Sequence, residues 1–351
     1  MRAPLGIADL KPDWLTDVLA AASGGAEVVG VEAVQVGNGM VADSVRLRLT
    51  WDRPNPGPDV LIAKVPAAAE ESRATAAAQR TYELEAAFYR DLAATVGVHT
   101  PRCYASAFDP ETQGYVVLLE DLAPAEVGDQ VTGCTVDQAA ATVRELVALH
   151  ASRWDDPELI ALDWLTRPEP GAAEFVGQLV NGLLPGFTDR YRDRLDPEVM
   201  ALVHRYIPQL GELAGHRPRP WTLVHGDFRL DNLLFGGERV AVLDWQTIKI
   251  GKSLSDVAYF VGSGLLPEER RAHEQDLVRA YHAGLRAAGV ELSWDEVWHD
   301  YRRYSFDGLT MAVAASMLVT RTDRGDDMFM AMAERHGRQA LDLDAESLLG
   351  G

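Results

Sequence analysis

The sequence predicts an α+β fold of two lobes: an N-terminal antiparallel sheet with one main helix, then a larger, mostly helical C-terminal lobe. In residues 45–51, apolar side chains alternate with polar ones, the two-residue period of a half-exposed strand. Beyond Pro124 the helical pattern dominates, with one short β interruption at residues 221–250. Strands and helices that are segregated along a chain favour an α+β architecture. We predict lobes at residues 1–122 and 123–351.

In the N-terminal lobe, we expect a short helix over residues 12–22 and a helix over 70–94, where Ala, Glu, Gln, Arg and Leu occur without Gly or Pro. Three antiparallel strands are expected before the second helix and two after it, and they lie in the segments EVVGVEAVQVG, SVRLRLTW, VLIAKV, RCYASAF and GYVVLLEDL. In the C-terminal lobe, Thr135 and Gln138 form a predicted capping box that begins a helix.

Composition excludes several classes of protein. The 351 residues are 47% hydrophobic and 25% charged, as in globular proteins with a core. Because 33 Lys and Arg face 53 Asp and Glu, a net charge of -20 argues against nucleic acid as a partner. Two cysteines, Cys103 and Cys134, make neither a disulfide framework nor a thiolate zinc site. No signal-peptide core or stretch of about 20 apolar residues occurs, so we expect a cytoplasmic protein without a membrane partner.

The strongest motif is His225-Gly226-Asp227 followed after four residues by Asn232, the H-x-D-x-x-x-x-N spacing of a kinase catalytic loop. Asp244 ends the strand-like segment ERVAVLD, twelve residues after Asn232. A predicted hairpin between them would place the Asn232 and Asp244 oxygens close enough to share Mg²⁺. Each triplet alone would indicate a turn or a strand end with exposed carboxylates. Their combined order and spacing favour the catalytic interpretation.

With LVHGDFRLDNLLF, VLDWQ and SDVAYF in this order, the sequence resembles the aminoglycoside phosphotransferase and choline kinase group of small-molecule kinases. It is most similar to the ecdysteroid-kinase-like branch of that group. The resemblance runs from LIAKV to RTDRGDDM, nearly the whole chain. It implies a protein-kinase-like fold and an ATP-dependent phosphotransferase that acts on an alcohol group of a small molecule.

The resemblance also implies roles for individual residues. Asp227 matches the catalytic aspartate, which orients the acceptor hydroxyl and accepts its proton, and Asn232 and Asp244 match the Mg²⁺ ligands. Lys64 matches the lysine that binds the α and β phosphates of ATP. Glu85 matches the helix partner of that lysine through the spacing Glu-x-x-Phe-Tyr, and Glu83 remains the alternative.

Further positions follow from the same resemblance. Arg229 is expected to contact the transferred phosphoryl group, although a surface arginine is an equally good interpretation. Gly37 and Gly39 stand where the glycine-rich loop is expected, but G-x-G without a third glycine also fits an ordinary turn. The backbone from Glu120 to Leu122 matches the hinge that holds adenine.

Three other residues bear on the catalytic segment. Trp245 follows Asp244 where protein kinases have Phe, so we do not expect the aspartate to switch between two positions. Asp256 matches an aspartate that braces the catalytic loop, and we expect His150 to be a hydrogen-bonded core histidine.

The acceptor is expected to contact residues 155–215 and the helices after residue 268. Asp323, Asp326 and Asp327 could form an acidic wall for a polycationic aminoglycoside. The same segments are rich in aromatic rings, most of which we expect in the core, and any that line a cleft favour an apolar hydroxylated acceptor. The rings belong to Trp164, Phe175, Phe187, Tyr191, Trp294, Trp298, Tyr301, Tyr304 and Phe306.

Two other functions compete with this one. A silent nucleotide-binding module is disfavoured because Lys64, Asp227, Asn232 and Asp244 are all present. A protein kinase is disfavoured because DWQTIKIGKSLSDVAYF is too short for an activation segment. The sequence indicates no oligomeric state.

Overall fold

The structure is a computed structural model that describes residues 2–37, 41–54, 56–169, 171–211 and 217–349. Residue contacts divide the chain into two compact units. The N-terminal unit comprises Met1–Ala125 and Ala241–Ile248, and the helical unit comprises Glu126–Val240 and Lys249–Gly351. The predicted α+β class is confirmed. The sequence predicts a single boundary after residue 122. In the structure, residues 241–248 also belong to the N-terminal unit.

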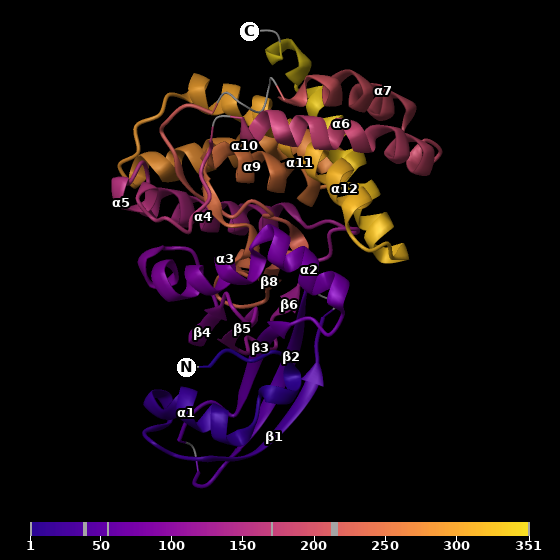
Figure 1. The fold of residues 1–351 in the computed structure, drawn as a ribbon. Coiled ribbons are helices and arrows are strands. Elements are labelled where there is room, and N and C mark those ends of the chain that lie inside the picture. Colours follow the sequence, from indigo (N-terminus) through magenta and orange to yellow (C-terminus); the bar gives the residue numbers. More distant parts are fainter. Residues whose placement is uncertain (1, 38–40, 55, 170, 212–216, 350–351) are drawn as a thin grey trace. The chain divides into compact units, whose positions relative to one another are not determined.

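The N-terminal unit is built on a five-stranded antiparallel sheet in the order β1-β2-β3-β5-β4 (Figure 1). The strands are β1 (Val28–Gln35), β2 (Ala42–Trp51), β3 (Val60–Pro66), β4 (Cys103–Asp109) and β5 (Gly114–Glu120). In the register of β3, Lys64 lies opposite Ser44 on one side and Val117 on the other. The five predicted strands are therefore present.

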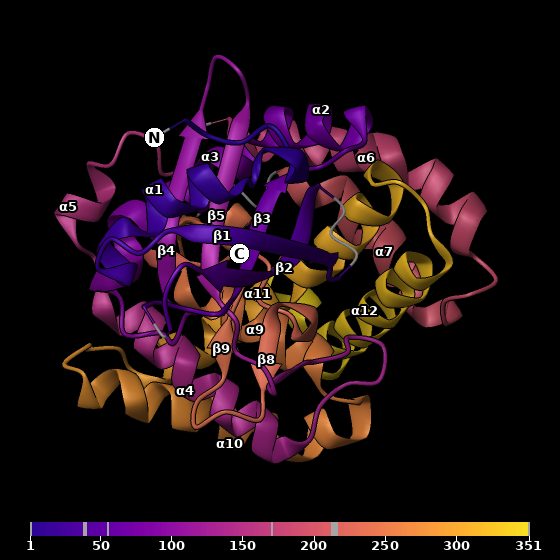
Figure 2. The ribbon, with the colours of Figure 1, turned by 90° about the horizontal axis from the view of Figure 1, so that it is seen from below.

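Helix α1 (Pro12–Ser23) covers one face of this sheet (Figure 2). Leu15 and Leu19 of α1 pack with Leu61 and other buried side chains from all the central strands. Because side chains alternate along a strand, Leu61, Ala63 and Val65 face this core and Lys64 faces the opposite side of β3.

The helix predicted over residues 70–94 is divided into shorter pieces. They are α2 (Glu70–Gln79), α3 (Thr81–Ala87), a π-helical turn (Phe88–Leu92) and a 3-10 turn (Ala93–Thr95). Arg80 separates α2 from α3 with a φ of 57°, a left-handed conformation that ends the first helix. Its guanidinium is bound to the Glu83 carboxylate at 2.8 Å, one turn into α3.

The helical unit gathers most of its helices into one bundle (Figure 1). Its helices are α4 (Val136–Ser152), α5 (Pro157–Ile160), α6 (Ala172–Tyr191), α7 (Pro197–Tyr206), α9 (Ser253–Gly264), α10 (Pro267–Ala287), α11 (Trp294–Leu318) and α12 (Asp323–Asp342). The predicted capping box is confirmed at Thr135 and Gln138. Two short antiparallel pairs accompany the helices: β7 (Thr222–Val224) with β10 (Lys249–Gly251), and β6 (Glu126–Val127) with β8 (Leu233–Phe235). β9 (Ala241–Val242) belongs to the N-terminal unit.

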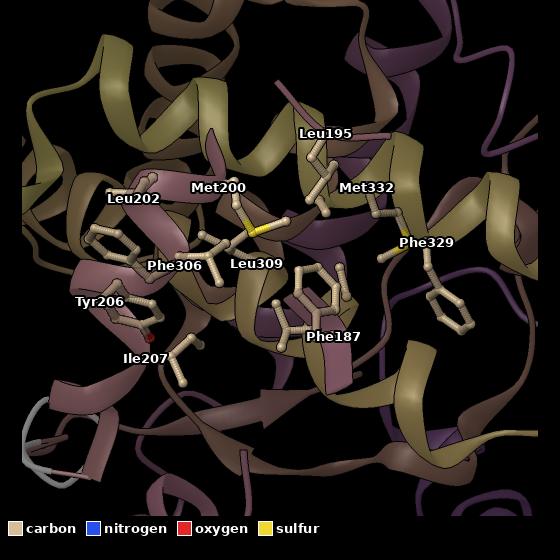
Figure 3. Packing of buried hydrophobic residues seen from close by; sticks show 14 of the residues in the cluster. Phe187, Leu195, Met200, Leu202, Tyr206, Ile207, Phe306, Leu309, Phe329 and Met332 are labelled. Carbon is tan, nitrogen blue, oxygen red and sulfur yellow. The ribbon is translucent and has the colours of Figure 1, made fainter. Parts of the chain in front are cut away.

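The core of the helical unit lies between α6, α7, α11 and α12 (Figure 3). Tyr206 and Phe306 stack with centroids 4.2 Å apart, and Phe187 and Leu309 are fully buried beside them. Leu309, Ala312 and Val313 are therefore buried residues of α11. Within the described ranges, no helix has the length and hydropathy needed to cross a membrane.

Three helices approach closely around His336 of α12. A Cβ on Gly308 of α11 would lie 2.1 Å from the His336 ring, and one on Gly262 of α9 would lie 1.9 Å from the Gln339 side chain. Both glycines are therefore required by the packing.

We predict that Gly308→Ala lowers the free energy of unfolding by about 3 kcal/mol, because the new methyl overlaps the His336 ring. The control is Gly182→Ala in α6, where nothing lies within 4 Å of the added atom. There the loss of backbone freedom in the unfolded chain should stabilise by about 0.5 to 1 kcal/mol. Urea denaturation measures both, and an unchanged Gly308→Ala variant would contradict the close approach of α11 and α12.

Candidate active site

A buried cluster of charges joins three separate segments of the N-terminal unit. The Lys64 ammonium, on β3, donates to Glu85 Oε1 of α3 and to Asp244 Oδ1, both at 2.7 Å. Asp244 lies just after β9 in the returning segment. Glu83, the alternative to Glu85, points elsewhere and pairs with Arg80. Of the two candidate carboxylates, Glu85 is the one in contact with Lys64.

The two carboxylates keep Lys64 charged. Burial lowers the pKa of the Lys64 ammonium, but the charges of Asp244 and Glu85 raise it more, so the net pKa lies above its ordinary value. Burial raises the pKa of Glu85, and the Lys64 charge opposes that effect. An ammonium has three N–H donors. They face Asp244 Oδ1 at 2.7 Å and Glu85, whose two carboxylate oxygens both lie 2.7 Å from Nζ.

The segment that follows Asp244 is fixed in the core of the N-terminal unit. Asp244 has a φ of 64°, and its Oδ2 accepts from the Gln246 amide at 3.3 Å. Trp245 is fully buried and stacks on Phe88 with centroids 3.9 Å apart, while its ring nitrogen donates to the Val242 carbonyl. This packing holds the tryptophan in place next to Asp244.

The predicted glycine loop and hinge are described in part. Gly37 has a φ of 72°, which favours glycine, and Gly39 lies outside the described residues. In the hinge, the Glu120 amide donates to the Arg102 carbonyl at 2.8 Å, and the Leu122 carbonyl accepts from Ala125 at 2.9 Å. These two groups are already bonded inside the unit. An adenine contact at the hinge therefore requires other backbone groups of the segment.

In the helical unit, Asp256 of α9 holds the backbone of the catalytic loop. Its two carboxylate oxygens accept the amide of His225 at 2.7 Å and that of Gly226 at 3.0 Å. His150 lies 3.3 Å from the same carboxylate and 2.8 Å from the Tyr281 hydroxyl. Burial raises the Asp256 pKa, but the hydrogen bond and charge of His150 lower it by a larger amount. The net pKa is therefore below its ordinary value.

Asp227 is surrounded by donors. Its Oδ1 accepts from the Tyr259 hydroxyl at 2.8 Å, and its Oδ2 accepts from Arg229 Nε and Asn232 Nδ2, both at 3.0 Å. Burial raises the Asp227 pKa, but the Arg229 charge and hydrogen bond outweigh it, so the net pKa is lowered. The carboxylate is therefore ionised at neutral pH.

Sequence reasoning missed Tyr259. The signal was its spacing in SDVAYF, because residues three apart on a helix share a face. Tyr259 therefore reaches the catalytic loop from the same side of α9 as Asp256.

Arg229 is bound within the helical unit. Besides Asp227, it donates to Asp231 Oδ2 at 2.7 Å and contacts the Met328 sulfur of α12 at 3.0 Å. Its side chain is 11% exposed. These contacts join Arg229 to the loop that carries Asp227, and the expected contact with phosphate stays a prediction.

The two residues predicted to bind Mg²⁺ have suitable oxygen atoms. Asn232 donates its amide nitrogen to the Asp227 carbonyl and carboxylate, so its carboxamide oxygen is the atom available to a metal. Asp244 offers a partly exposed carboxylate. Mg²⁺ in phosphoryl transfer takes one or two such protein oxygens together with phosphates and water. In the part of the chain that the structure describes, no group of three or more His, Cys, Asp or Glu side chains is placed to hold a metal.

Two of the three carboxylates of the expected acidic wall, Asp326 and Asp327, are paired with cations. Asp326 accepts from the Tyr191 hydroxyl and from Arg321, both at 2.7 Å, and Asp327 pairs with Arg194 at 2.7 Å. These carboxylates are therefore less available to a polycationic acceptor than the sequence suggested.

Most of the candidate acceptor rings belong to the core, as expected. The fully or almost fully buried rings are those of Phe187, Tyr191, Tyr301, Tyr304 and Phe306. Phe175 is the opposite case, because its side chain is 67% exposed on α6.

We predict that Asp256→Asn lowers the free energy of unfolding by about 3 kcal/mol at pH 7, because an amide group would face a backbone amide donor. The folded pKa of Asp256 lies below its unfolded value, so its contribution is complete above pH about 4 and is lost as the pH falls through the folded pKa. The difference between variant and wild type should therefore shrink below pH about 4.

The matched control is Asp189→Asn, which removes a carboxylate that is 79% exposed and pairs with Arg192 on the surface. Its effect should stay within about 0.5 kcal/mol. Denaturation curves at several pH values compare the two variants. Equal, small effects at pH 7 would contradict the bracing role of Asp256.

Solved structures with similar folds extend over nearly the whole chain. A choline kinase from Cryptosporidium parvum Iowa II has a TM-score of 0.60 at 12% identity and covers 96% of each chain. A putative aminoglycoside phosphotransferase from Ralstonia eutropha has a TM-score of 0.53 at 18% identity, covering 95% of this chain and 98% of the other. At these identities the likeness shows the fold alone, a protein-kinase-like fold of small-molecule kinases.

Curated relatives match over short segments. Acyl-CoA dehydrogenase family member 10 of Mus musculus is 44% identical over 73 residues, which is 18% of this chain and 7% of the relative. Family member 11 of Homo sapiens is 34% identical over 89 residues, 22% of this chain and 11% of the relative. This chain thus matches only a small part of much longer proteins.

The family assignment rests on a longer match. The model of the phosphotransferase enzyme family matches residues 46–292, more than half of the chain. This range includes Lys64, Glu85, Asp227, Asn232 and Asp244. The chain belongs to the phosphotransferase enzyme family.

Proposed function

We propose that this phosphotransferase moves the γ-phosphate of ATP to a hydroxyl group of a small molecule. The observation that carries the proposal is the environment of Asp227. Three donors and a lowered pKa keep its carboxylate ionised and oriented. An ionised, fixed carboxylate is what a hydroxyl nucleophile requires for alignment and for removal of its proton.

In the proposed reaction, Asp227 accepts a hydrogen bond from the acceptor hydroxyl. The hydroxyl oxygen forms a bond to the γ-phosphorus as the bond to the β–γ bridging oxygen breaks, and ADP leaves. The proton passes to Asp227. Oδ1 is the better candidate for this contact, because it accepts one protein donor whereas Oδ2 accepts two.

Lys64 supplies the nucleotide side of the proposal. Its raised pKa keeps the ammonium charged, which suits it to bind the α or β phosphate of ATP. Asn232 offers a carboxamide oxygen and Asp244 a carboxylate oxygen, and each is a type of ligand that Mg²⁺ takes. When bound, the ion would neutralise negative charge on the phosphates.

For the acceptor, we propose a hydroxylated molecule with an apolar body in preference to an aminoglycoside. The pairing of Asp326 and Asp327 with arginines weakens the main argument for a polycation. Burial of most rings also weakens the argument from aromatic content, so the preference rests chiefly on charge. The dehydrogenase named in the short curated matches is not proposed for this chain.

The silent-module alternative is disfavoured by the same contacts. A module that only binds nucleotide has no use for an ionised Asp227 with three donors, or for a loop whose backbone is fixed by Asp256. Keeping such a buried carboxylate has a cost in desolvation. The arrangement therefore supports catalysis.

The test is ATP consumption against a panel of hydroxylated compounds: aminoglycosides, macrolides, choline-like amines, sterols and sugars. We predict turnover with at least one apolar alcohol and none with aminoglycosides. On the identified acceptor, Asp227→Asn should lower kcat by at least about a thousandfold and leave ATP affinity within about twofold, because Asp227 faces the acceptor.

Asp193→Asn, an exposed carboxylate of the same unit, is the matched control and should keep wild-type turnover. Phosphorylation of aminoglycosides alone would reverse the acceptor preference and leave the phosphotransferase proposal intact. Wild-type turnover by Asp227→Asn would show that the catalytic centre is misplaced.

A further inference from the structure

A buried tyrosine hydroxyl contacts the carboxylate that holds Lys64. Tyr115 of β5 donates to Glu85 Oε2 at 2.5 Å, and its ring is fully buried. Tyr115 lies two residues before Val117, the residue opposite Lys64 in the sheet register. Side chains two apart on a strand share a face, so Tyr115 and Lys64 lie on the same side of the sheet as Glu85.

The hydroxyl matters because Glu85 shares its ammonium partner. Lys64 also donates to Asp244, and the proposed function requires it to donate to a phosphate as well. Glu85 is 2% exposed, so water cannot replace a weakened contact. A buried carboxylate without enough donors is costly. Tyr115 is the second donor to Glu85 and does not have to move toward the nucleotide.

The ring that carries this hydroxyl is fixed. Tyr115 stacks on Tyr82 with centroids 4.6 Å apart and an angle of 7° between the planes. Tyr82, on α3, donates to the Val41 carbonyl at 2.5 Å and accepts from the Ala67 amide at 3.1 Å. The stacked pair thus joins α3 to the start of β2 and the end of β3. All of these contacts lie inside the N-terminal unit.

The Tyr115 hydroxyl acts as a donor. Burial and the charge of Glu85 raise its pKa well above the ordinary value, so it stays protonated. A protonated phenol next to a carboxylate donates its hydrogen.

We propose that Tyr115 is a positioning residue for nucleotide binding, which acts by holding Glu85 in the place from which Glu85 orients Lys64. This inference rests on the proposed function, because it gives Lys64 the role of a phosphate ligand. It adds a residue that touches neither nucleotide nor acceptor. It also explains why a polar hydroxyl is buried near the start of β5, where all the other residues except Glu120 are apolar or glycine.

The test is Tyr115→Phe in the full chain, which keeps the ring stack and removes only the hydroxyl. The Kd of ATP with Mg²⁺, measured by calorimetry, should rise about tenfold, the change expected when one hydrogen bond to a charged group is lost. The kcat at saturating ATP should stay within about twofold of wild type, because Asp227 and its donors are unchanged.

Tyr89→Phe is the matched control. Tyr89 is a buried tyrosine of the same unit whose hydroxyl has no hydrogen-bond partner within the described residues. Its removal should leave the Kd unchanged. A merely structural loss would instead lower stability in Tyr115→Phe without moving the Kd of the folded protein, measured well below the unfolding midpoint.

A double-mutant cycle with Glu85→Gln identifies the route. If Tyr115 acts through Glu85, the double variant should bind nucleotide no more weakly than Glu85→Gln alone. Additive losses, or a wild-type Kd in Tyr115→Phe, would overturn the inference while the proposed function stands. If the wild-type protein itself binds no ATP with Mg²⁺, the proposed function fails first.

Discussion

The loop that carries Asp227 depends on one buried carboxylate, that of Asp256, which accepts hydrogen bonds from two backbone amides. Asp256 fixes His225 and Gly226, and the next residue along the chain is Asp227. Gly226 has a φ of 82°, a conformation that suits glycine, so the turn that presents Asp227 is built from a glycine and an external acceptor together. Every residue of α9 is buried, and this packing holds both Asp256 and Tyr259 in position beside the loop.

The N-terminal unit also contains buried charges that are held in position by hydrogen bonds. Lys64 and Glu85 are largely buried, and the charge of each is compensated by more than one hydrogen-bond partner. Buried charges are tolerated when their hydrogen bonds are complete, and removal of one partner is then costly. A surface pair such as Arg192 with Asp189 carries no comparable constraint. In both units, the side chains of the candidate site are therefore held in position by buried charges and their hydrogen-bond donors.

Much of this arrangement could be predicted from sequence, and the remainder has a clear physical reason. The alternation in β2 and the H-x-D-x-x-x-x-N spacing are local patterns, so the sheet and the Asp227 loop could be predicted from the sequence. The break at Arg80 and the Tyr115 contact could not be, because a left-handed residue and a partner 30 positions away leave no periodic signal. The pairing of Asp326 could not be predicted either, because one of its cations, Arg194, is distant in the sequence.

The central proposal is that the chain binds ATP together with Mg²⁺, with Lys64 as a phosphate ligand and Asn232 as a metal ligand. Its most direct test is the thermal shift caused by ATP, with and without Mg²⁺, in wild type, Lys64→Met and Asn232→Ala. The account predicts a metal-dependent rise in Tm for wild type by mass action, a small rise for Lys64→Met, and loss of the metal dependence for Asn232→Ala. A full, metal-dependent shift in Asn232→Ala, or no shift in wild type, would contradict it.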